Sequence, residues 1–207
     1  MEKSLLMCDS TEGDGKAEIV MDYIMSYSLR HAVDKYLIEK PMLCRYCRYM
    51  LGVLLGDLSI TDKTKIESIK VWKEWQHMDL CVEAVIKVGA TNQTYAILIE
   101  NKYYSKLREN QLLDYKKKFD DYYDNNKEVC VPTANRRYKL VTCHDEEKIA
   151  AIYGYEIEKT KTEGQKGFVA LQFYDLLPKK YLHGDEKNYI YEETESEIFN
   201  EFWLRKW

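Results

Sequence analysis

The chain has 207 residues, of which 45% are hydrophobic and 32% charged, and its formal net charge is −4. This composition argues against a disordered chain, and no apolar run approaches the roughly 18–20 residues of a membrane span. A net negative charge excludes a general attraction to nucleic acid, so such a partner would need a local basic patch. The length suits one domain over residues 1–207.

The cysteines and the first residues bear on the cellular compartment. The apolar patch before Cys8 is shorter than the roughly 7–15 residues of a signal-peptide core. Six cysteines without an export signal indicate reduced thiols. We therefore expect a cytoplasmic protein that has no membrane partner.

The first quarter of the chain has a helical pattern. Apolar residues at three- and four-residue intervals predict a helix over Ala17–Tyr36. Pro41 stands near the start of a second helix, which ends near Gly56. We therefore expect a helical N-terminal part over about residues 15–56.

Three strands are expected next. A tract rich in Val, Ile and Trp, without Gly or Pro, predicts strands at about 66–75 and 79–88. The segment GATNQ, residues 89–93, is typical of a turn. The segment TYAILIENK, residues 94–102, predicts a third strand that forms an antiparallel hairpin with the second.

Helices and strands alternate in the second half. In chain order we expect a helix over 106–123, a strand over 136–143, a short helix over 145–154, a strand over 167–173 and an amphipathic helix over 195–207. Asp145 is a suitable N-cap for the short helix. The pattern predicts an α/β fold: a central mixed β-sheet flanked by helices, with the antiparallel hairpin carrying the site.

The third strand ends in a charged triplet, Glu100-Asn101-Lys102, directly after four apolar residues. Alternate strand residues share a face, so Glu100 and Lys102 point the same way and Asn101 points the opposite way. Because the start of one hairpin strand lies near the end of the next, Asp79 is expected beside Glu100. Two adjacent carboxylates repel each other unless a cation joins them, and hard oxygen ligands suit Mg²⁺.

This arrangement predicts a metal-dependent phosphodiesterase centre. Asp79, Glu100 and the backbone carbonyl of Asn101 would hold Mg²⁺ or Mn²⁺. Lys102 would orient or deprotonate the attacking water and offset negative charge on the phosphate. The structural alternative is a salt bridge between Glu100 and Lys102 at an exposed strand end.

The order of these residues resembles the motif of the PD-(D/E)XK nuclease superfamily, in which an aspartate opens one strand and a Glu-x-Lys triplet ends the next. The segment AILIENK followed by ENQLLDYKKKF resembles more closely a bacterial branch with the signature IEnK…QL..Y. Met78 stands where many members carry proline. The resemblance is strong over Trp72–Tyr123, looser over Glu18–Leu55 and slight beyond Lys139.

The resemblance implies a restriction-endonuclease-like core that acts on nucleic acid with a divalent metal. It also implies that Gln111, on the helix after the Glu-x-Lys strand, belongs to the site. A further acid is implied on the first core helix; Glu18 is our candidate and Asp22 the alternative. The expected catalytic residues are therefore Asp79, Glu100, Lys102, Gln111 and Glu18.

Basic residues gather around the end of the third strand and along the next helix. We expect five of them to contact nucleic-acid phosphates independently of sequence: Lys106, Arg108, Lys116, Lys117 and Lys118. Arg136, Arg137 and Lys139 form a second basic group at the start of the fourth strand.

Cys44 and Cys47 form a CxxC pair, which is half of a structural zinc site. Cys143-His144 would be an unusual second half. Because the pair falls on an expected helix, we interpret both thiols as small buried hydrophobes.

We interpret the chain as a Mg²⁺-dependent nuclease, with a bacterial or phage-borne DNA endonuclease favoured over an RNA-directed enzyme. The rival interpretation is a non-catalytic nucleic-acid-binding or protein-interaction domain that retains the fold. A homodimer, or a protein partner that adds affinity for DNA, is compatible with the acidic charge of the chain.

Overall fold

The computed structural model describes residues 4, 6, 14–56, 59–126, 128–162, 166–179, 181–182, 185–189 and 191–205. The apolar patch before Cys8 lies outside these residues, apart from Ser4 and Leu6. In this part of the chain, none of the helices has the length and apolar character that crossing a bilayer requires.

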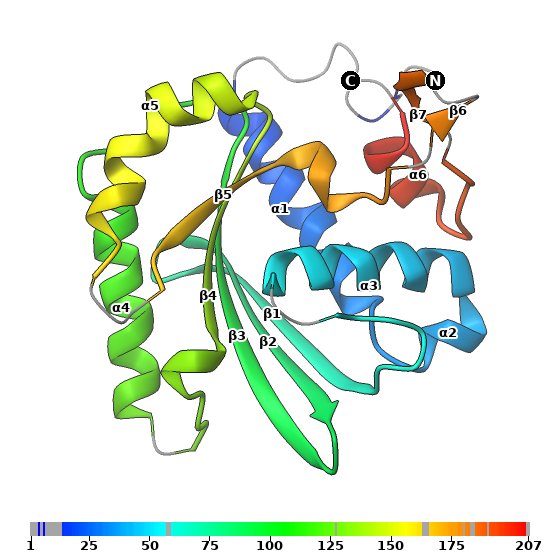
Figure 1. Ribbon diagram of the computed structural model, residues 1–207, viewed down its shortest axis with the longest axis horizontal. Coiled ribbons are helices and arrows are strands. Elements are labelled where there is room, and N and C mark those ends of the chain that lie inside the picture. Colours follow the sequence, from blue (N-terminus) through cyan, green and yellow to red (C-terminus); the bar gives the residue numbers. More distant parts are fainter. Residues whose placement is uncertain are drawn as a thin grey trace.

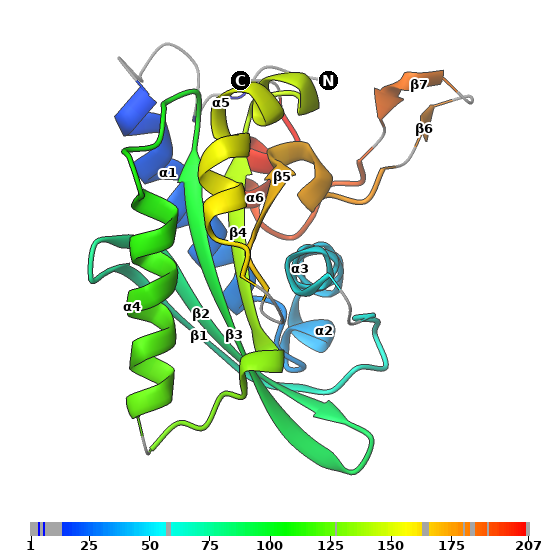
Figure 2. The ribbon, with the colours of Figure 1, turned by 60° about the vertical axis from the view of Figure 1, so that its left-hand side comes forward.

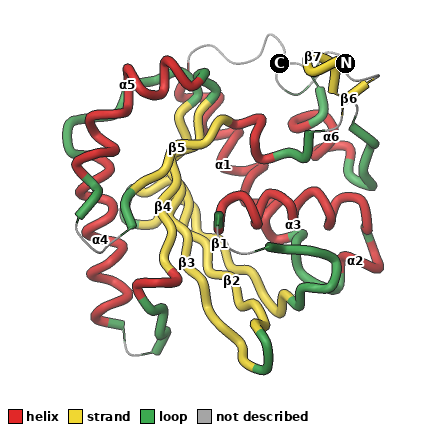
Figure 3. The backbone as a smooth tube through the Cα atoms, in the orientation of Figure 1, coloured by secondary structure: helices red, strands yellow, loops and turns green. Residues whose placement is uncertain are grey.

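A five-stranded mixed sheet forms the centre of the fold (Figures 1 and 3). The strands lie in the sheet in chain order, as β1 (Ile66–Trp75), β2 (Met78–Val88), β3 (Thr91–Lys102), β4 (Arg136–Thr142) and β5 (Phe168–Gln172). The first three pair antiparallel, whereas β4 joins β3 and β5 joins β4 in parallel. A parallel neighbour needs a long crossover, and helices supply it twice. The predicted α/β fold with a mixed sheet and an antiparallel hairpin is confirmed.

Helices cover both faces of the sheet (Figure 2). The first face packs against α1 (Asp14–Arg30), α3 (Pro41–Leu55) and α6 (Glu197–Trp203). The second packs against α4 (Gln111–Asn125) and α5 (Glu146–Lys159). The remaining elements are α2 (Tyr36–Glu39), the 3₁₀ turns η1 (Thr133–Asn135) and η2 (Phe173–Leu176), and the strand pair β6 (Tyr181–Leu182) and β7 (Asp185–Tyr189).

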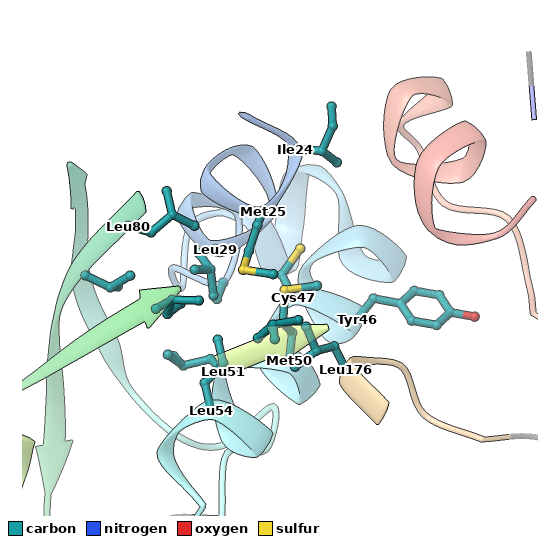
Figure 4. Packing of buried hydrophobic residues seen from close by; sticks show 14 of the residues in the cluster. Ile24, Met25, Leu29, Tyr46, Cys47, Met50, Leu51, Leu54, Leu80 and Leu176 are labelled. Atoms are coloured by element: carbon teal, nitrogen blue, oxygen red, sulfur yellow. The ribbon is translucent and has the colours of Figure 1, made fainter. Parts of the chain in front are cut away.

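The larger core lies between the first face and the α1/α3 layer. Met25 from α1, Met50 from α3 and Leu80 of β2 all belong to this core (Figure 4). Cys44 and Cys47 are fully buried on α3, so the prediction that they serve as small hydrophobes is confirmed. Because both faces of the sheet are covered, β3 is buried continuously from Tyr95 onward, which explains its apolar run.

The first helix is shorter than predicted. It ends at Arg30, whereas the sequence indicates a helix to Tyr36. The buried guanidinium of Arg48 donates to the backbone carbonyl of Ala32 at 3.0 Å and to Asp34 Oδ1 at 2.6 Å. These contacts provide hydrogen-bond partners for the Ala32 carbonyl and the Asp34 carboxylate outside a helix. Tertiary contacts therefore outweigh the helical spacing of apolar residues beyond Arg30.

Two other boundaries differ from prediction. The hairpin turn between β2 and β3 contains only Gly89 and Ala90, because Gly89 adopts a φ of 61° that allows a tight reversal. Helix α4 begins at Gln111, since Asn110 has left-handed backbone dihedrals that a continuous helix cannot include. Lys106 and Arg108 therefore lie in the preceding loop.

The helix predicted from 145 to 154 is confirmed at its start and extends further. Asp145 caps it by accepting a hydrogen bond from the backbone N–H of Lys148 at 2.9 Å. The helix continues through Gly154 to Lys159, because Tyr153 and Ile157 continue its buried stripe.

Candidate active site

The pairing of β2 with β3 brings the two predicted metal-binding carboxylates together. Leu80 lies opposite Ile99, so Asp79 and Glu100 occupy adjacent strand positions at one end of the sheet. Asp79 Oδ2 accepts a hydrogen bond from the backbone N–H of Asn101 at 2.8 Å. The structure therefore contains the adjacency that the hairpin pattern predicts.

Glu100 lies at the centre of this site and is only 1% exposed. Its Oε1 accepts hydrogen bonds from Lys102 Nζ at 2.8 Å and from Gln111 Nε2. Its Oε2 is buried and has no hydrogen-bond donor among the described residues. Gln111 is the first residue of α4, so the start of this helix aims a polar side chain at the end of β3.

The charges of the site are only partly compensated. Burial, and then the charge of Asp79, raise the pKa of Glu100 well above its ordinary value. Burial also raises the pKa of Asp79, although the Asn101 N–H and Lys102 oppose that rise. Burial alone would lower the pKa of Lys102, but Glu100 outweighs it and the pKa is raised. Lys102 therefore holds its proton, which favours an orienting and charge-offsetting role over that of a base.

Helix α1 contributes two acids, one turn apart, and both reach the site. Glu18 Oε1 accepts from the backbone N–H of Tyr103 at 3.0 Å, and its Oε2 lies 3.6 Å from Lys102 Nζ. Asp22 Oδ1 accepts from Asn101 Nδ2 at 2.6 Å. Burial, and then the charge of Asp79, raise the pKa of Asp22 to about 7. The structure therefore brings both sequence alternatives to the end of the hairpin.

The side chain of Asn101 is a site feature that sequence reasoning missed, since only its backbone carbonyl was expected to take part. Its backbone N–H binds Asp79 and its amide binds Asp22, so it links β2 to α1. The signal was present, because the alternation of strand residues turns Asn101 away from Glu100 and toward the face that α1 covers.

A divalent cation fits the chemistry of these residues. Asp79 and Glu100 place two carboxylates side by side, with one buried oxygen lacking a donor and both pKa values raised. Within the described ranges, no group of three or more His, Cys, Asp or Glu residues is placed to hold a metal ion, so the two carboxylates would have to be completed by other oxygen ligands and water. Mg²⁺ is commonly held by one or two carboxylates and retains several waters.

The five predicted phosphate-binding residues divide into two sets. Lys106 and Arg108 in the loop, and Lys117 and Lys118 on α4, are exposed. Lys116 is 6% exposed and forms an ion pair with Asp120 at 2.8 Å. This position suits packing against the second face of the sheet and does not suit phosphate contact.

The second basic group, Arg136, Arg137 and Lys139, is internal, so it adds nothing to a surface that could contact phosphates. Arg136 forms ion pairs with Asp120 at 3.1 Å and Asp124 at 2.6 Å. Arg137 donates to the backbone carbonyl of Leu55 at 2.8 Å, and Lys139 is also buried. These charges join β4 to its neighbouring elements.

Two carboxylates and a lysine at the end of a hairpin, within a mixed sheet flanked by helices, define a site of the nuclease type. A model of the PD-(D/E)XK nuclease superfamily matches residues 7–153, which is most of the chain. The protein belongs to the PD-(D/E)XK nuclease superfamily. The match includes every candidate site residue named above. Comparison with curated proteins and with solved structures finds no significant match.

Proposed function

We propose that this protein is a divalent-metal-dependent endonuclease that hydrolyses phosphodiester bonds in DNA. The observation that carries the proposal is the buried pair of Asp79 and Glu100. Among the described residues Glu100 Oε2 has no hydrogen-bond donor, and Lys102 lies beside the pair. Membership of the superfamily supports nuclease chemistry. Reduced cysteines fit a cytoplasmic setting, which is part of the same proposal.

Each residue has a role that follows from its contacts. Asp79, Glu100 and the backbone carbonyl of Asn101 would hold Mg²⁺ or Mn²⁺. When bound, the cation supplies Lewis-acid stabilisation of the charge that develops on the phosphate. Lys102, held between Glu100 and Glu18, orients the attacking water and offsets that charge as well.

The side chains of Gln111 and Asp22, and the N–H groups of Asn101, position the groups that act on the phosphate. Gln111 fixes the Glu100 carboxylate by donating to Oε1, which leaves Oε2 for the cation. Asn101 holds Asp79 through its N–H, and Asp22 in turn holds the Asn101 amide. Such supporting contacts reduce the freedom of the ligands before substrate arrives.

The rival interpretation is a non-catalytic interaction domain in which Glu100 and Lys102 form an exposed salt bridge. Their burial argues against it, since Glu100 is 1% and Lys102 8% exposed. Because desolvation offsets the attraction within a buried ion pair, such a pair with an unsatisfied oxygen adds little or no stability, so a role in function explains it better than a role in folding. The exposed cations Lys106, Arg108, Lys117 and Lys118 support a nucleic-acid partner, and a homodimer or an accessory protein would add to their affinity.

The direct test is cleavage by the purified protein. Supercoiled plasmid DNA, linear duplex DNA, single-stranded DNA and RNA should be incubated separately with Mg²⁺, with Mn²⁺ and with EDTA. We expect cleavage of DNA, including the closed plasmid, with either metal and none with EDTA. If RNA is cleaved faster than DNA, RNA and not DNA is the substrate. If none of the four substrates is cleaved, the result favours the non-catalytic interaction domain.

A second prediction concerns the exposed lysines of α4. Replacing Lys117 and Lys118 together by glutamine should weaken duplex binding similarly for all sequences. Each lost phosphate contact lowers the salt slope by about 0.9. Binding should be measured in EDTA between low and moderate salt. The control is Lys63→Gln/Lys65→Gln, because these exposed lysines precede β1, at the end of the β1–β2 hairpin that lies away from Asp79. If the salt dependence of duplex binding does not change, Lys117 and Lys118 are solvent-exposed residues that make no phosphate contact.

A further inference from the structure

A pocket of about 80 Å³ lies on the second face of the sheet, between the β1–β2 hairpin and α4. We call it the aromatic pocket, and it is lined by Trp72, Trp75, Cys81, Glu83, Tyr122 and Tyr123. It is several times larger than the roughly 10–15 Å³ that one water needs. Trp72 is 39% exposed, so the aromatic wall that it contributes to the pocket is open to solvent.

The other aromatic walls are held in fixed geometry. The rings of Trp75 and Tyr122 meet edge to face, with centroids 4.6 Å apart, and those of Tyr122 and Tyr123 are 4.9 Å apart. Edge-to-face pairs at such distances stabilise one another. The pocket therefore offers a preformed aromatic surface, and not a set of mobile side chains.

A buried carboxylate gives this apolar pocket an acceptor. Glu83 is 7% exposed, and its Oε1 accepts a hydrogen bond from the Tyr123 hydroxyl at 2.9 Å. Burial, and then Glu83, raise the pKa of Tyr123, so the phenol keeps its proton and remains the donor. The carboxylate has a second oxygen, and Lys70, directly opposite Glu83 on β1, forms no ion pair with it in the described part of the chain. A ligand N–H group would reduce the cost of burying this charge.

The register of the hairpin places the pocket close to the candidate active site. Trp72 lies opposite Cys81 in the β1–β2 pairing. Asp79, Cys81 and Glu83 are every second residue of β2, so their side chains lie on the same face of the sheet. Two residues along a strand span about 7 Å. Consecutive nucleotides are about 3.4 Å apart along the axis of a stacked strand and further apart in an unstacked one, so about 7 Å spans at most about two nucleotides. A strand whose phosphate lies at Asp79 would thus have a neighbouring base within reach of Trp72.

We propose that the aromatic pocket receives an unpaired nucleobase next to the phosphate that is cleaved. The proposal rests on the nuclease function proposed above. The base stacks on Trp72 and donates an N–H group to Glu83; aromatic stacking accepts any base, and a carboxylate suits the amino group of cytosine. A paired base cannot make both contacts: its amino group still exposes one N–H in the major groove, but its two faces are covered by the neighbouring base pairs. The preferred substrate is therefore a strand with unpaired bases near the cleaved bond.

The test is oligonucleotide binding in EDTA, where no cleavage occurs. Fluorescence anisotropy should compare labelled oligodeoxycytidine, a duplex and a chain of abasic sites. Trp72→Ala should weaken binding of oligodeoxycytidine about tenfold or more, as expected for a lost stacking contact. Binding of the duplex and of the abasic chain should stay within about twofold, the scatter expected for substitutions outside a contact. Tyr155→Ala, which removes an aromatic ring that is 75% exposed on α5, should change nothing.

Two further variants keep the test decisive. Trp72→Phe preserves a stacking face and should retain most of the affinity for oligodeoxycytidine, and it serves as the main variant if Trp72→Ala does not fold. Oligodeoxycytidine should also quench tryptophan fluorescence less in Trp72→Phe than in wild type. Glu83→Gln keeps an acceptor for Tyr123 but removes the charge, so it should weaken oligodeoxycytidine binding several-fold, about the difference between a charge-assisted hydrogen bond and a neutral one.

The outcomes separate this proposal from the nuclease function. Equal binding of oligodeoxycytidine by wild type and Trp72→Ala, or equal quenching in wild type and Trp72→Phe, would overturn it. A matched loss on the duplex and on oligodeoxycytidine would overturn it too, since stacking of an unpaired base predicts a difference. Trp72-dependent binding by a wild type that cleaves nothing would support the pocket and reject the nuclease function.

Discussion

Replacing Lys102 by alanine is expected to lower the rate of DNA cleavage about 10²- to 10³-fold, the range for losing a group that offsets charge developing in the transition state. The ammonium lies 2.8 Å from Glu100 and 3.6 Å from Glu18, so it belongs to the site but not to the metal ligands. Its removal takes away a positive charge near the carboxylates. Mn²⁺ binding should therefore be unchanged or slightly tighter, while affinity for nucleic acid falls modestly.

Single-turnover cleavage and calorimetric Mn²⁺ titration measure these two effects separately. Lys102→Arg should also be impaired, because a planar guanidinium keeps the charge but not the compact geometry of an ammonium. Lys63→Ala, at an exposed position before β1, is the matched control and should cleave like wild type. Equal rates for wild type and Lys102→Ala would reduce Glu100 and Lys102 to a structural ion pair and favour the interaction-domain interpretation.

The double variant Asp79→Ala/Glu100→Ala should lose measurable Mn²⁺ binding, because both side-chain ligands are removed. In wild type, the affinity should rise with pH. The raised pKa values of Asp79 and Glu100 mean that the metal-free site retains protons to a higher pH than ordinary carboxyls do. Metal binding needs the ionised form, so protons compete with Mn²⁺ below these raised pKa values and are released on binding.

Calorimetry in two buffers of different ionisation enthalpy measures both the affinity and the number of protons released. Glu146→Ala/Glu147→Ala removes two exposed acids from the first turn of α5 and is the matched control, with Mn²⁺ binding like that of wild type. Equal Mn²⁺ binding by wild type and by the Asp79/Glu100 double variant would show that the cation is held elsewhere. An affinity that does not vary with pH would contradict the coupling to raised pKa values.

The arrangement of the hairpin and its charges could be predicted from the sequence because it depends on local rules. Strand alternation puts Glu100 and Lys102 on one face, and their 2.8 Å contact agrees with it. A short turn between β2 and β3 then requires Asp79 to lie near Glu100, whichever residues form the turn. Gln111 followed from the family resemblance, and its contact with Glu100 survives even though the helix begins later than predicted.

Only the tertiary structure decided which helix acids reach the site and which basic side chains are buried. Glu18 and Asp22 both contact the end of the sheet, because the rotation of α1 about its axis depends on its packing against the sheet and α3 and not on local spacing. Lys116 and Arg136 are both neutralised by Asp120, and Arg137 binds a carbonyl of α3 that is 82 residues away in the chain. Partners so distant in sequence leave no periodic signal, so a basic run looks the same whether it faces water or the core.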